Sequence, residues 1–456
     1  MTKQVRKLFG TDGVRGRANS EPMTAEVALS LGQAIAHVFR RAQGNGRHAI
    51  LIGKDTRLSG YMFEDALAAG ICSMGVDVIH VGPIPTPALA FLTSDMRCDA
   101  GVMITASHNP YEDNGIKFFG RDGFKLADEI ELQIERLVSS GELAQHRASA
   151  DEIGRATRIV DVEGRYVVFL KRTFPSDVTL DGIRVVLDCA NGAAYKVGPT
   201  VLRELGAEVF TLGVEPNGRN INLDCGALHP QNTVNRVLEV RADVGIAVDG
   251  DADRVMVVDE RGQVLDGDVV IALCARHLID RGALRGGGVV TTVMSNLGLE
   301  EELRERGLEL VRTQVGDRHV VEAMREGGYN LGGEQSGHVI FLDHTTTGDG
   351  LMTALQVLAI MAREGVPLSM LAAGFNRYPQ AMVNVGVSQK RPLEELSTLR
   401  DAIAEVEAKL DGRGRVLIRY SGTELKARVM VEGQDEHQVH EYATYLAGVL
   451  KQALAA

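Results

Sequence analysis

A buried apolar run, a polar turn and an amphipathic helix follow one another three times along the chain. Each repeat opens with a run typical of a buried strand: AILIG (49–53), IRVVLDC (183–189) and GVVTTVM (288–294). A turn rich in Ser, Asn or Asp and a helical pattern follow, and a second strand-like run closes the unit. Successive strand–helix–strand units place parallel strands in one sheet, with helices on its faces. The pattern therefore predicts three related α/β domains with mixed or parallel sheets.

The end of the chain follows a different pattern. Apolar residues recur at the helical period from Leu396 to Leu410, RVLIRY and ARVMVEG flank a turn as in a hairpin, and a second helical pattern follows. We expect a smaller C-terminal α+β domain here. Breaks in the pattern predict four domains, at residues 1–155, 156–258, 259–373 and 374–456.

Composition and charge narrow the class of partner. The chain has 49 basic and 61 acidic residues, a net charge of −12, which argues against nucleic-acid binding. The five cysteines are an odd number without metal or redox spacing, so we expect reduced thiols in the cytoplasm. The first residues lack the apolar core of a signal peptide, and no run is long and apolar enough to span a membrane.

The first stretch with candidate chemistry is TASHNP (105–110). Ser107 stands where an apolar run ends, and strand ends are where α/β sheets place their chemistry. A serine there can act as a nucleophile if a neighbour activates it. The alternative is a turn in which Ser, Asn and Pro serve only the geometry. His108 and Lys117 follow closely and could assist the serine.

The second stretch, DGDADR (249–254), joins two strand-like runs. Its three carboxylates, Asp249, Asp251 and Asp253, repel one another in a tight loop unless a cation lies among them. Oxygen ligands of this kind favour Mg²⁺ or Ca²⁺. An EF-hand is disfavoured because Arg254 occupies its glycine position and strands flank the loop. A solvated acidic turn is the other alternative, and Mg²⁺ is the favoured interpretation.

The third stretch is GGEQSGH (332–338). Glycines allow close approach to a ligand, and Glu334, Ser336 and His338 alternate, so in an extended segment all three would face one side. A carboxylate and a hydroxyl suit vicinal sugar hydroxyls. An ordinary glycine-rich turn is an equally good interpretation of this stretch alone.

The fourth stretch is RYSGTELKAR (419–428). Backbone N–H groups and hydroxyls of a turn can bind an anion, and arginines are bidentate phosphate donors. This prediction rests on Arg419, Ser421, Gly422, Thr423 and Arg428. A simple hairpin turn would not need two arginines, so phosphate binding is favoured.

Together the four stretches resemble the α-D-phosphohexomutase superfamily, with one motif in each domain. The opening FGTDGVRG (9–16), alanine within DGDADR and Gln335 in GEQSGH are closest to its glucosamine-phosphate subgroup. Many relatives have Pro where this chain has Tyr420 and Leu425, which affects only the expected stiffness of the last loop. The resemblance covers nearly the whole chain.

The resemblance implies a reaction and roles for the residues. Four domains would surround a central cleft, the last as a mobile lid, and Ser107 would be carried as phosphoserine. The enzyme would interconvert glucosamine 6-phosphate and glucosamine 1-phosphate for UDP-N-acetylglucosamine synthesis, through a 1,6-bisphosphate. One Mg²⁺ would be held by the three aspartates and the phosphoserine. Glucosamine or glucose 1,6-bisphosphate would be the activator of the enzyme. Candidate positive partners of the transferring group are Arg15, Arg254, His108 and Lys117.

Some alternatives stay open at this point. The general base is Lys117 or His338, and His338 could instead only hydrogen-bond the sugar. Glucose or mannose phosphates are alternative substrates, and a metal-dependent phosphatase or a non-catalytic sugar-phosphate sensor are alternative classes. A sugar phosphate is the expected small-molecule partner. A homodimer is left open, because no oligomeric interface can be identified in the sequence.

Overall fold

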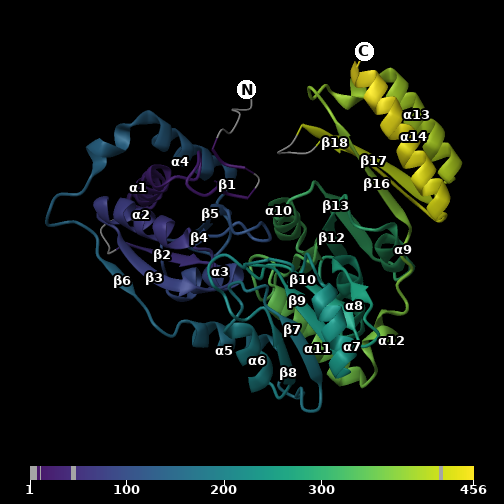
Figure 1. Cartoon of the computed structure of the whole chain (residues 1–456), viewed down its shortest axis with the longest axis horizontal. Coiled ribbons are helices and arrows are strands. Elements are labelled where there is room, and N and C mark those ends of the chain that lie inside the picture. Colours follow the sequence, from purple (N-terminus) through teal and green to yellow (C-terminus); the bar gives the residue numbers. More distant parts are fainter. Residues whose placement is uncertain (1–7, 11, 43–47, 421–424, 456) are drawn as a thin grey trace. The chain divides into compact units, whose positions relative to one another are not determined.

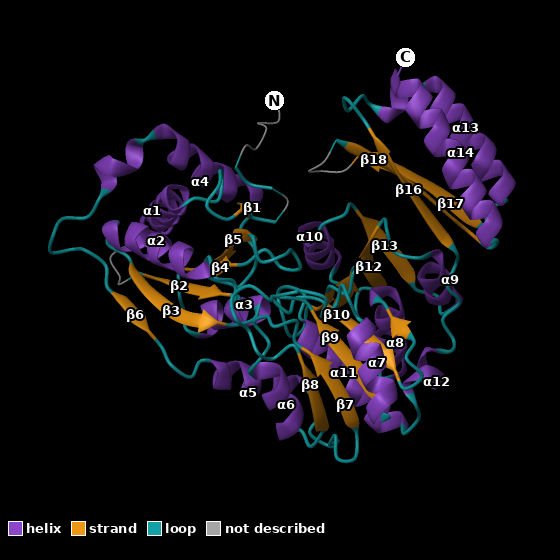
Figure 2. Cartoon of the chain, viewed as in Figure 1, coloured by secondary structure: helices purple, strands orange, loops and turns teal. Residues whose placement is uncertain are grey.

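The computed structural model describes residues 8–10, 12–42, 48–420 and 425–455, and Figure 1 labels most of its helices and strands. Helices and strands alternate along most of the chain, as the hydrophobic pattern predicts (Figure 2). The chain divides into two compact units. The first contains the residues up to Met294 together with Val311–Gly374, and the second contains Ser295–Leu310 and the residues from Phe375 onward. Within the described residues, no helix has both the length and the apolarity needed to cross a bilayer.

The first sheet carries the serine loop, which is residues 105–112 between β4 and β5. Its strands lie in the order β1-β5-β4-β2-β3-β6. Strands β2, β3, β4 and β6 run parallel, and β5 turns back to pair antiparallel with β4 and β1. The strand bounds are β1 Val14–Arg17, β2 Ala49–Lys54, β3 Asp77–Pro83, β4 Ala100–Ile104, β5 Asp113–Gly120 and β6 Ala156–Arg158. The helices are α1 Ala25–Ala42, α2 Gly60–Ser73, α3 Thr86–Asp95, α4 Asp128–Ser140 and the 3₁₀ turn η1 Glu142–His146.

The second sheet carries the aspartate loop. Its order is β11-β10-β9-β7-β8, with β7 parallel to β8 and β9, and β10 antiparallel to β9. The DGDADR loop joins β9 to β10, so strands flank it as predicted and an EF-hand is excluded. The bounds are β7 Arg184–Asp188, β8 Glu208–Leu212, β9 Val244–Val248, β10 Val255–Asp259, β11 Val264–Leu265, α5 Glu163–Thr173, α6 Val197–Glu204 and α7 Gln231–Val240.

The third sheet, β13-β12-β14-β15, carries the GEQSGH stretch. The bounds are α8 Gly267–Asp280, β12 Gly288–Thr292, α9 Leu297–Glu305, β13 Glu309–Thr313, α10 Asp317–Gly327, β14 Leu331–Gly333, β15 Val339–Phe341, α11 Gly350–Glu364 and α12 Leu368–Ala372. The prediction that Glu334 to His338 are extended was wrong. The segment is the turn of the β14–β15 hairpin, closed by the Gly337 N–H donating to the Glu334 carbonyl at 3.0 Å, with Gly337 at φ +88°.

The second unit contains the predicted α+β domain. Its sheet, β16-β18-β17, is antiparallel throughout. The bounds are β16 Gln380–Gly386, the 3₁₀ turn η2 Leu393–Glu395, α13 Ser397–Leu410, β17 Gly414–Tyr420, β18 Lys426–Gly433 and α14 Glu436–Ala455. Apolar side chains of β18 and α14, including Val429, Val431, Leu446 and Leu450, form its core.

Helix α9 belongs to this second unit although it precedes β13 in the chain. Buried Glu432 of β18 accepts the Leu297 N–H at 3.0 Å, and Arg415 Nη2 donates to the Ser295 carbonyl at 2.6 Å. Asn296 exchanges two hydrogen bonds with the backbone of Tyr378 at 2.9 and 3.0 Å. The start of α9 is therefore fixed to the C-terminal domain by directed polar contacts.

Candidate active site

Ser107 lies at the carboxyl end of β4, as the sequence indicated. It is 1% exposed and adopts a left-handed backbone conformation with φ +52°, which is uncommon for a residue with a Cβ. Its Oγ donates to Asp249 Oδ2 at 2.7 Å and lies 3.3 Å from His108 Nδ1. The serine loop and the aspartate loop, distant in sequence, therefore meet at this hydroxyl.

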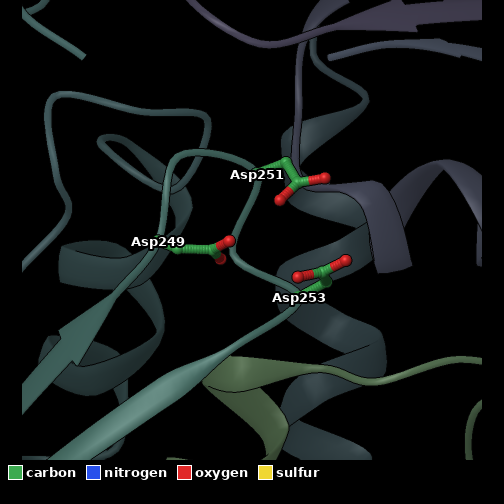
Figure 3. A group of neighbouring side chains, drawn as sticks. All are labelled: Asp249, Asp251 and Asp253. Atoms are coloured by element: carbon green, nitrogen blue, oxygen red, sulfur yellow. The ribbon is translucent and has the colours of Figure 1, made fainter. Parts of the chain in front are cut away.

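The three aspartates of DGDADR form a buried cluster. One oxygen from each lies within 4.8 Å of the others, and Figure 3 shows the carboxylates turned toward a common space. Burial, and then the charges of Asp253 and Asp251, raise the pKa of Asp249 well above its usual range. Crowding of this kind is relieved when a cation lies among the carboxylates.

The donor set fits Mg²⁺. Asp251 Oδ1 and Asp253 Oδ1 are buried and, within the described part of the chain, accept no hydrogen bond. Buried carboxylate oxygens without a partner are costly unless an ion is bound. All-oxygen anionic ligands are those that hard divalent cations prefer. These three residues could therefore hold one such ion next to Ser107.

Lys117 of β5 lies against the same cluster. Its Nζ is 3.0 Å from Asp251 Oδ2, 3.2 Å from Asp12 Oδ2 and 3.6 Å from Asp253 Oδ2. Burial alone would lower the pKa of Lys117, but the charges of these carboxylates outweigh it and raise the pKa above its ordinary value. The side chain is therefore an ammonium in this arrangement.

The two arginines expected near the transferring group also lie at the site. The Arg254 N–H donates to Asp249 Oδ1 at 3.2 Å, and its Nε is 3.8 Å from Asp253 Oδ1. Arg15 of β1 pairs with Asp12. Burial would lower the pKa of Arg15, but the charges of Asp12, Asp251 and Asp253 raise it. Both guanidiniums are therefore positive groups on the aspartate side of Ser107.

His108 differs from the positive partner that we expected. Burial, and then the charges of Arg254 and Arg15, lower the pKa of His108 to about 4. Its Nδ1 lies 3.0 Å from Arg254 Nη1, so the ring accepts a hydrogen bond from the guanidinium. The imidazole is therefore neutral in this arrangement, and an added negative group such as a phosphate on Ser107 would favour its charged form.

The hairpin turn brings His338 and Glu334 to the site. His338 is 2% exposed, and its Nε2 accepts the Gly348 N–H at 3.2 Å and lies 3.9 Å from Asp253 Oδ2. Glu334 Oε1 accepts the Gly316 N–H at 3.2 Å, and Ser336 Oγ donates to Glu334 Oε2 at 3.3 Å. The turn therefore positions all three predicted side chains, although by a bend and not by strand alternation.

The predicted phosphate-binding residues are only partly described. Arg419 of β17 and Arg428 of β18 lie directly opposite each other in the antiparallel register, while Ser421, Gly422 and Thr423 lie outside the described residues. Burial, and then the charge of Arg428, lower the pKa of Arg419. Like charges in opposed positions repel. This pair would therefore gain from an anion bound between the two side chains.

A buried charged network near the site was not predicted. Lys125 pairs with Asp12 and with Asp317 at the start of α10, the latter at 2.5 Å, and Asp317 Oδ2 lies 3.7 Å from His338 Nε2. Thr86 Oγ1 donates to Asp251 Oδ2 at 2.6 Å. Of Asp12, Lys125, Asp317 and Thr86, which were not predicted for the site, only Asp12 lies in a motif that the sequence singled out, FGTDGVRG.

Comparison with known proteins agrees with this geometry. The phosphoglucomutase/phosphomannomutase family models match in four parts: alpha/beta/alpha domain I at residues 6–145, domain II at 165–262, domain III at 266–378 and the C-terminal domain at 382–449. A phosphoglucosamine mutase from Myxococcus xanthus is 59% identical over 449 residues, 98% of each chain.

Two solved structures share the fold. A phosphoglucomutase/phosphomannomutase family protein from Burkholderia thailandensis superposes with a TM-score of 0.81 at 27% identity, over 98% of this chain and 97% of the other. An N-acetylphosphoglucosamine mutase from Aspergillus fumigatus, in complex with GlcNAc-6P and magnesium, has a TM-score of 0.67 at 19% identity, over 98% and 96% of the two chains. At that identity the likeness concerns the fold alone. From the sequence relatives and the four matched domains together, the chain belongs to the phosphoglucosamine mutases, isomerases of the α-D-phosphohexomutase superfamily.

Proposed function

We propose that this chain interconverts glucosamine 6-phosphate and glucosamine 1-phosphate, with Ser107 carrying the phosphoryl group between the two sugar oxygens. The observation that carries the proposal is the buried Ser107 hydroxyl, 2.7 Å from Asp249 in the aspartate cluster. Phosphoserine would donate to one oxygen of the sugar, giving the 1,6-bisphosphate, and would recover phosphate from the other. Glucosamine is favoured over glucose and mannose because relatives at 56–59% identity are phosphoglucosamine mutases.

Asp249, Asp251 and Asp253, with an oxygen of phosphorylated Ser107, would hold one Mg²⁺. When bound, Mg²⁺ would offset the phosphate charge and polarise the phosphorus. The Aspergillus neighbour, crystallised with magnesium, supports this choice of metal by analogy. Glucosamine or glucose 1,6-bisphosphate would serve as activator, because it can load Ser107 with phosphate.

The protein groups around Ser107 would stabilise the transferring phosphoryl group. Arg15, Arg254 and Lys117 supply positive charge at the aspartate side of the serine, where the phosphate oxygens would lie. His338 already accepts the Gly348 N–H at Nε2, so Nδ1 is the ring nitrogen left to donate. We assign that N–H to a sugar hydroxyl. Lys117 is an ammonium in this arrangement, so it could take the proton of the attacking hydroxyl only after giving up one of its own.

The rest of the substrate would be bound by the two remaining motifs. Glu334 and Ser336 would hold sugar hydroxyls. The non-reacting phosphate would be bound by residues of the C-terminal domain: Arg419, Ser421, Gly422, Thr423 and Arg428. We keep the predicted domains 1–155, 156–258, 259–373 and 374–456 as part of this proposal, with the last as a lid. The five cysteines are free thiols in the described chain, which supports a cytoplasmic location.

The test is a Ser107→Ala variant assayed beside the wild type. We expect the variant to fold, to lack isomerase activity and to lack phosphate at this position, while the active wild type carries about one phosphate by intact mass. Turnover by the alanine variant at the wild-type rate would refute the proposal. Release of labelled phosphate without isomerised sugar would favour a phosphatase instead, and ligand binding without phosphate exchange would favour a sensor.

A further inference from the structure

Arg57 is a fully buried arginine that the proposed reaction does not use. It lies in the KDTR segment just after β2 and is 0% exposed. Its Nε donates to Asp55 Oδ2 at 2.8 Å, so this buried carboxylate forms an ion pair with the guanidinium of Arg57. An arginine with a paired charge at this depth acts mainly through the geometry of its donors.

The four other N–H groups of Arg57 all donate to backbone carbonyls between Ser107 and Asp113. Nη2 donates to the carbonyls of Ser107 at 2.9 Å and Asn109 at 2.8 Å, and Nη1 donates to those of Asp113 at 3.0 Å and Pro110. A guanidinium has five N–H donors in a rigid planar fork, and here each has an acceptor. The loop backbone is therefore wrapped around a single immobile group.

Asn222 reaches the same loop from the segment between β8 and α7. Its Nδ2 donates to the Ser107 carbonyl at 2.9 Å and to the Asn109 carbonyl at 3.0 Å. Each carbonyl thus accepts one bond from Arg57 and one from Asn222, which uses both lone pairs. A Cβ on Gly250 of the aspartate loop would lie 2.7 Å from the backbone carbonyl oxygen of Ser107 and 2.8 Å from Asn222 Nδ2. A glycine there lets the three segments meet.

We infer that Arg57 and Asn222 form a clamp on the Ser107 and Asn109 carbonyls, and that this clamp positions the Ser107 hydroxyl against Asp249. The inference rests on the proposed function of Ser107. The serine has a left-handed backbone, and its N–H is bound by the Thr105 hydroxyl at 2.9 Å instead of by a neighbouring strand. The Asn109 N–H also donates to the Ala106 carbonyl at 3.1 Å, but this bond lies within the loop itself, whereas Arg57 and Asn222 fix the loop to other segments. Without the clamp, we expect the direction of Oγ to relax.

The clamp should affect the rate of phosphoryl transfer more than the binding of sugar phosphate. Neither residue belongs to the motifs proposed to bind the sugar or its second phosphate. A displacement of about 1 Å at a reacting group can lower a rate about 100-fold. Arg57→Lys keeps the positive charge but has at most three donors for five acceptors. Asn222→Gly removes the amide at φ +58°, a conformation that glycine adopts freely.

Each clamp variant has a matched control. Lys54→Met removes a buried cation from the end of β2, three positions before Arg57, where it pairs with Glu64 and not with the serine loop. Asp224→Gly removes a side chain two positions from Asn222 at a similar φ of +51°. For all four full-length variants, we would measure kcat, KM, Tm and the rate at which glucose 1,6-bisphosphate loads phosphate onto Ser107, followed by intact mass.

The expected result is that both clamp variants lose about 100-fold in kcat and in loading rate, with KM close to wild type, while both controls keep their rates. The clamp is overturned if the loading rates of Arg57→Lys and Asn222→Gly match those of controls with equal Tm. If Arg57→Lys does not fold, the comparison of Asn222→Gly with its control Asp224→Gly decides whether the clamp is needed. A wild type that never gains phosphate on Ser107 would instead overturn the proposed function itself.

Discussion

Gly348→Ala offers a test of His338 that leaves the imidazole in the protein. A Cβ on residue 348 would lie 2.2 Å from His338 Cδ2 and 2.4 Å from Nε2, whereas ordinary contacts begin at 3.4 Å. Gly348 is not among the residues with positive φ, so alanine is not strained there by its own backbone. The substitution therefore acts through the ring, which has to move by about 1 Å or turn.

The size of the effect follows from how closely the ring is packed. His338 is 2% exposed, and extra carbon in a packed interior costs about 1–3 kcal/mol of folding stability. For catalysis, a shift of about 1 Å in a group that holds the substrate lowers kcat/KM about 100-fold. We expect this loss in a coupled assay of glucosamine 1-phosphate formation, together with a lower Tm.

A double-mutant cycle separates the ring from other causes. In a His338→Ala background the clash is gone, so adding Gly348→Ala should cost little further activity. Gly386→Ala is the control, because a Cβ there meets nothing within 4 Å. If Gly348→Ala has wild-type kcat/KM, or if its loss is equally large without the imidazole, the reasoning about His338 is wrong.

Three further predictions concern the metal, the distal phosphate and the sugar. Asp251→Asn should weaken Mg²⁺ binding and slow isomerisation by orders of magnitude, and chelation should stop the wild type until Mg²⁺ is restored; full activity after rigorous metal removal would contradict this role. Arg419→Ala should raise KM roughly 10- to 150-fold, since a charge-assisted phosphate contact contributes about 1.5–3 kcal/mol; an unchanged KM would place the distal phosphate elsewhere. Glucosamine 6-phosphate should have a higher kcat/KM than glucose 6-phosphate, and the reverse preference would move the chain to a sister subgroup.

Much of the fold could be predicted because its strands are short, apolar and bounded by polar turns. The runs at 49–53, 183–189 and 288–294 overlap β2, β7 and β12. The contact between Ser107 and the aspartates could be predicted only from the resemblance to the superfamily, because no spacing rule relates residues this far apart in the sequence.

The remaining site features depend on contacts that a linear pattern does not encode. The GEQSGH stretch alternates like a strand, but the positive φ of Gly337 folds it into a turn. In the sequence Arg57 cannot be distinguished from an exposed arginine. Four of its five acceptors are backbone carbonyls, which every residue has, so no residue type signals them. The Lys125–Asp317 pair is likewise a contact between distant segments, invisible to periodicity.

The discontinuity of the second unit has a consequence for how the chain folds during synthesis. The segment Ser295–Leu310, which contains α9, ends about 65 residues before Phe375, where the rest of the unit begins, and Glu432 follows later still. At roughly 5–20 residues per second, the ribosome needs about 3–13 seconds to cover that gap. During this interval residues Val311–Gly374 of the first unit are synthesised, while the polar partners of α9 do not yet exist. The C-terminal domain therefore matures by recruiting a helix synthesised earlier, and a fragment beginning at Phe375 would lack one of its own parts.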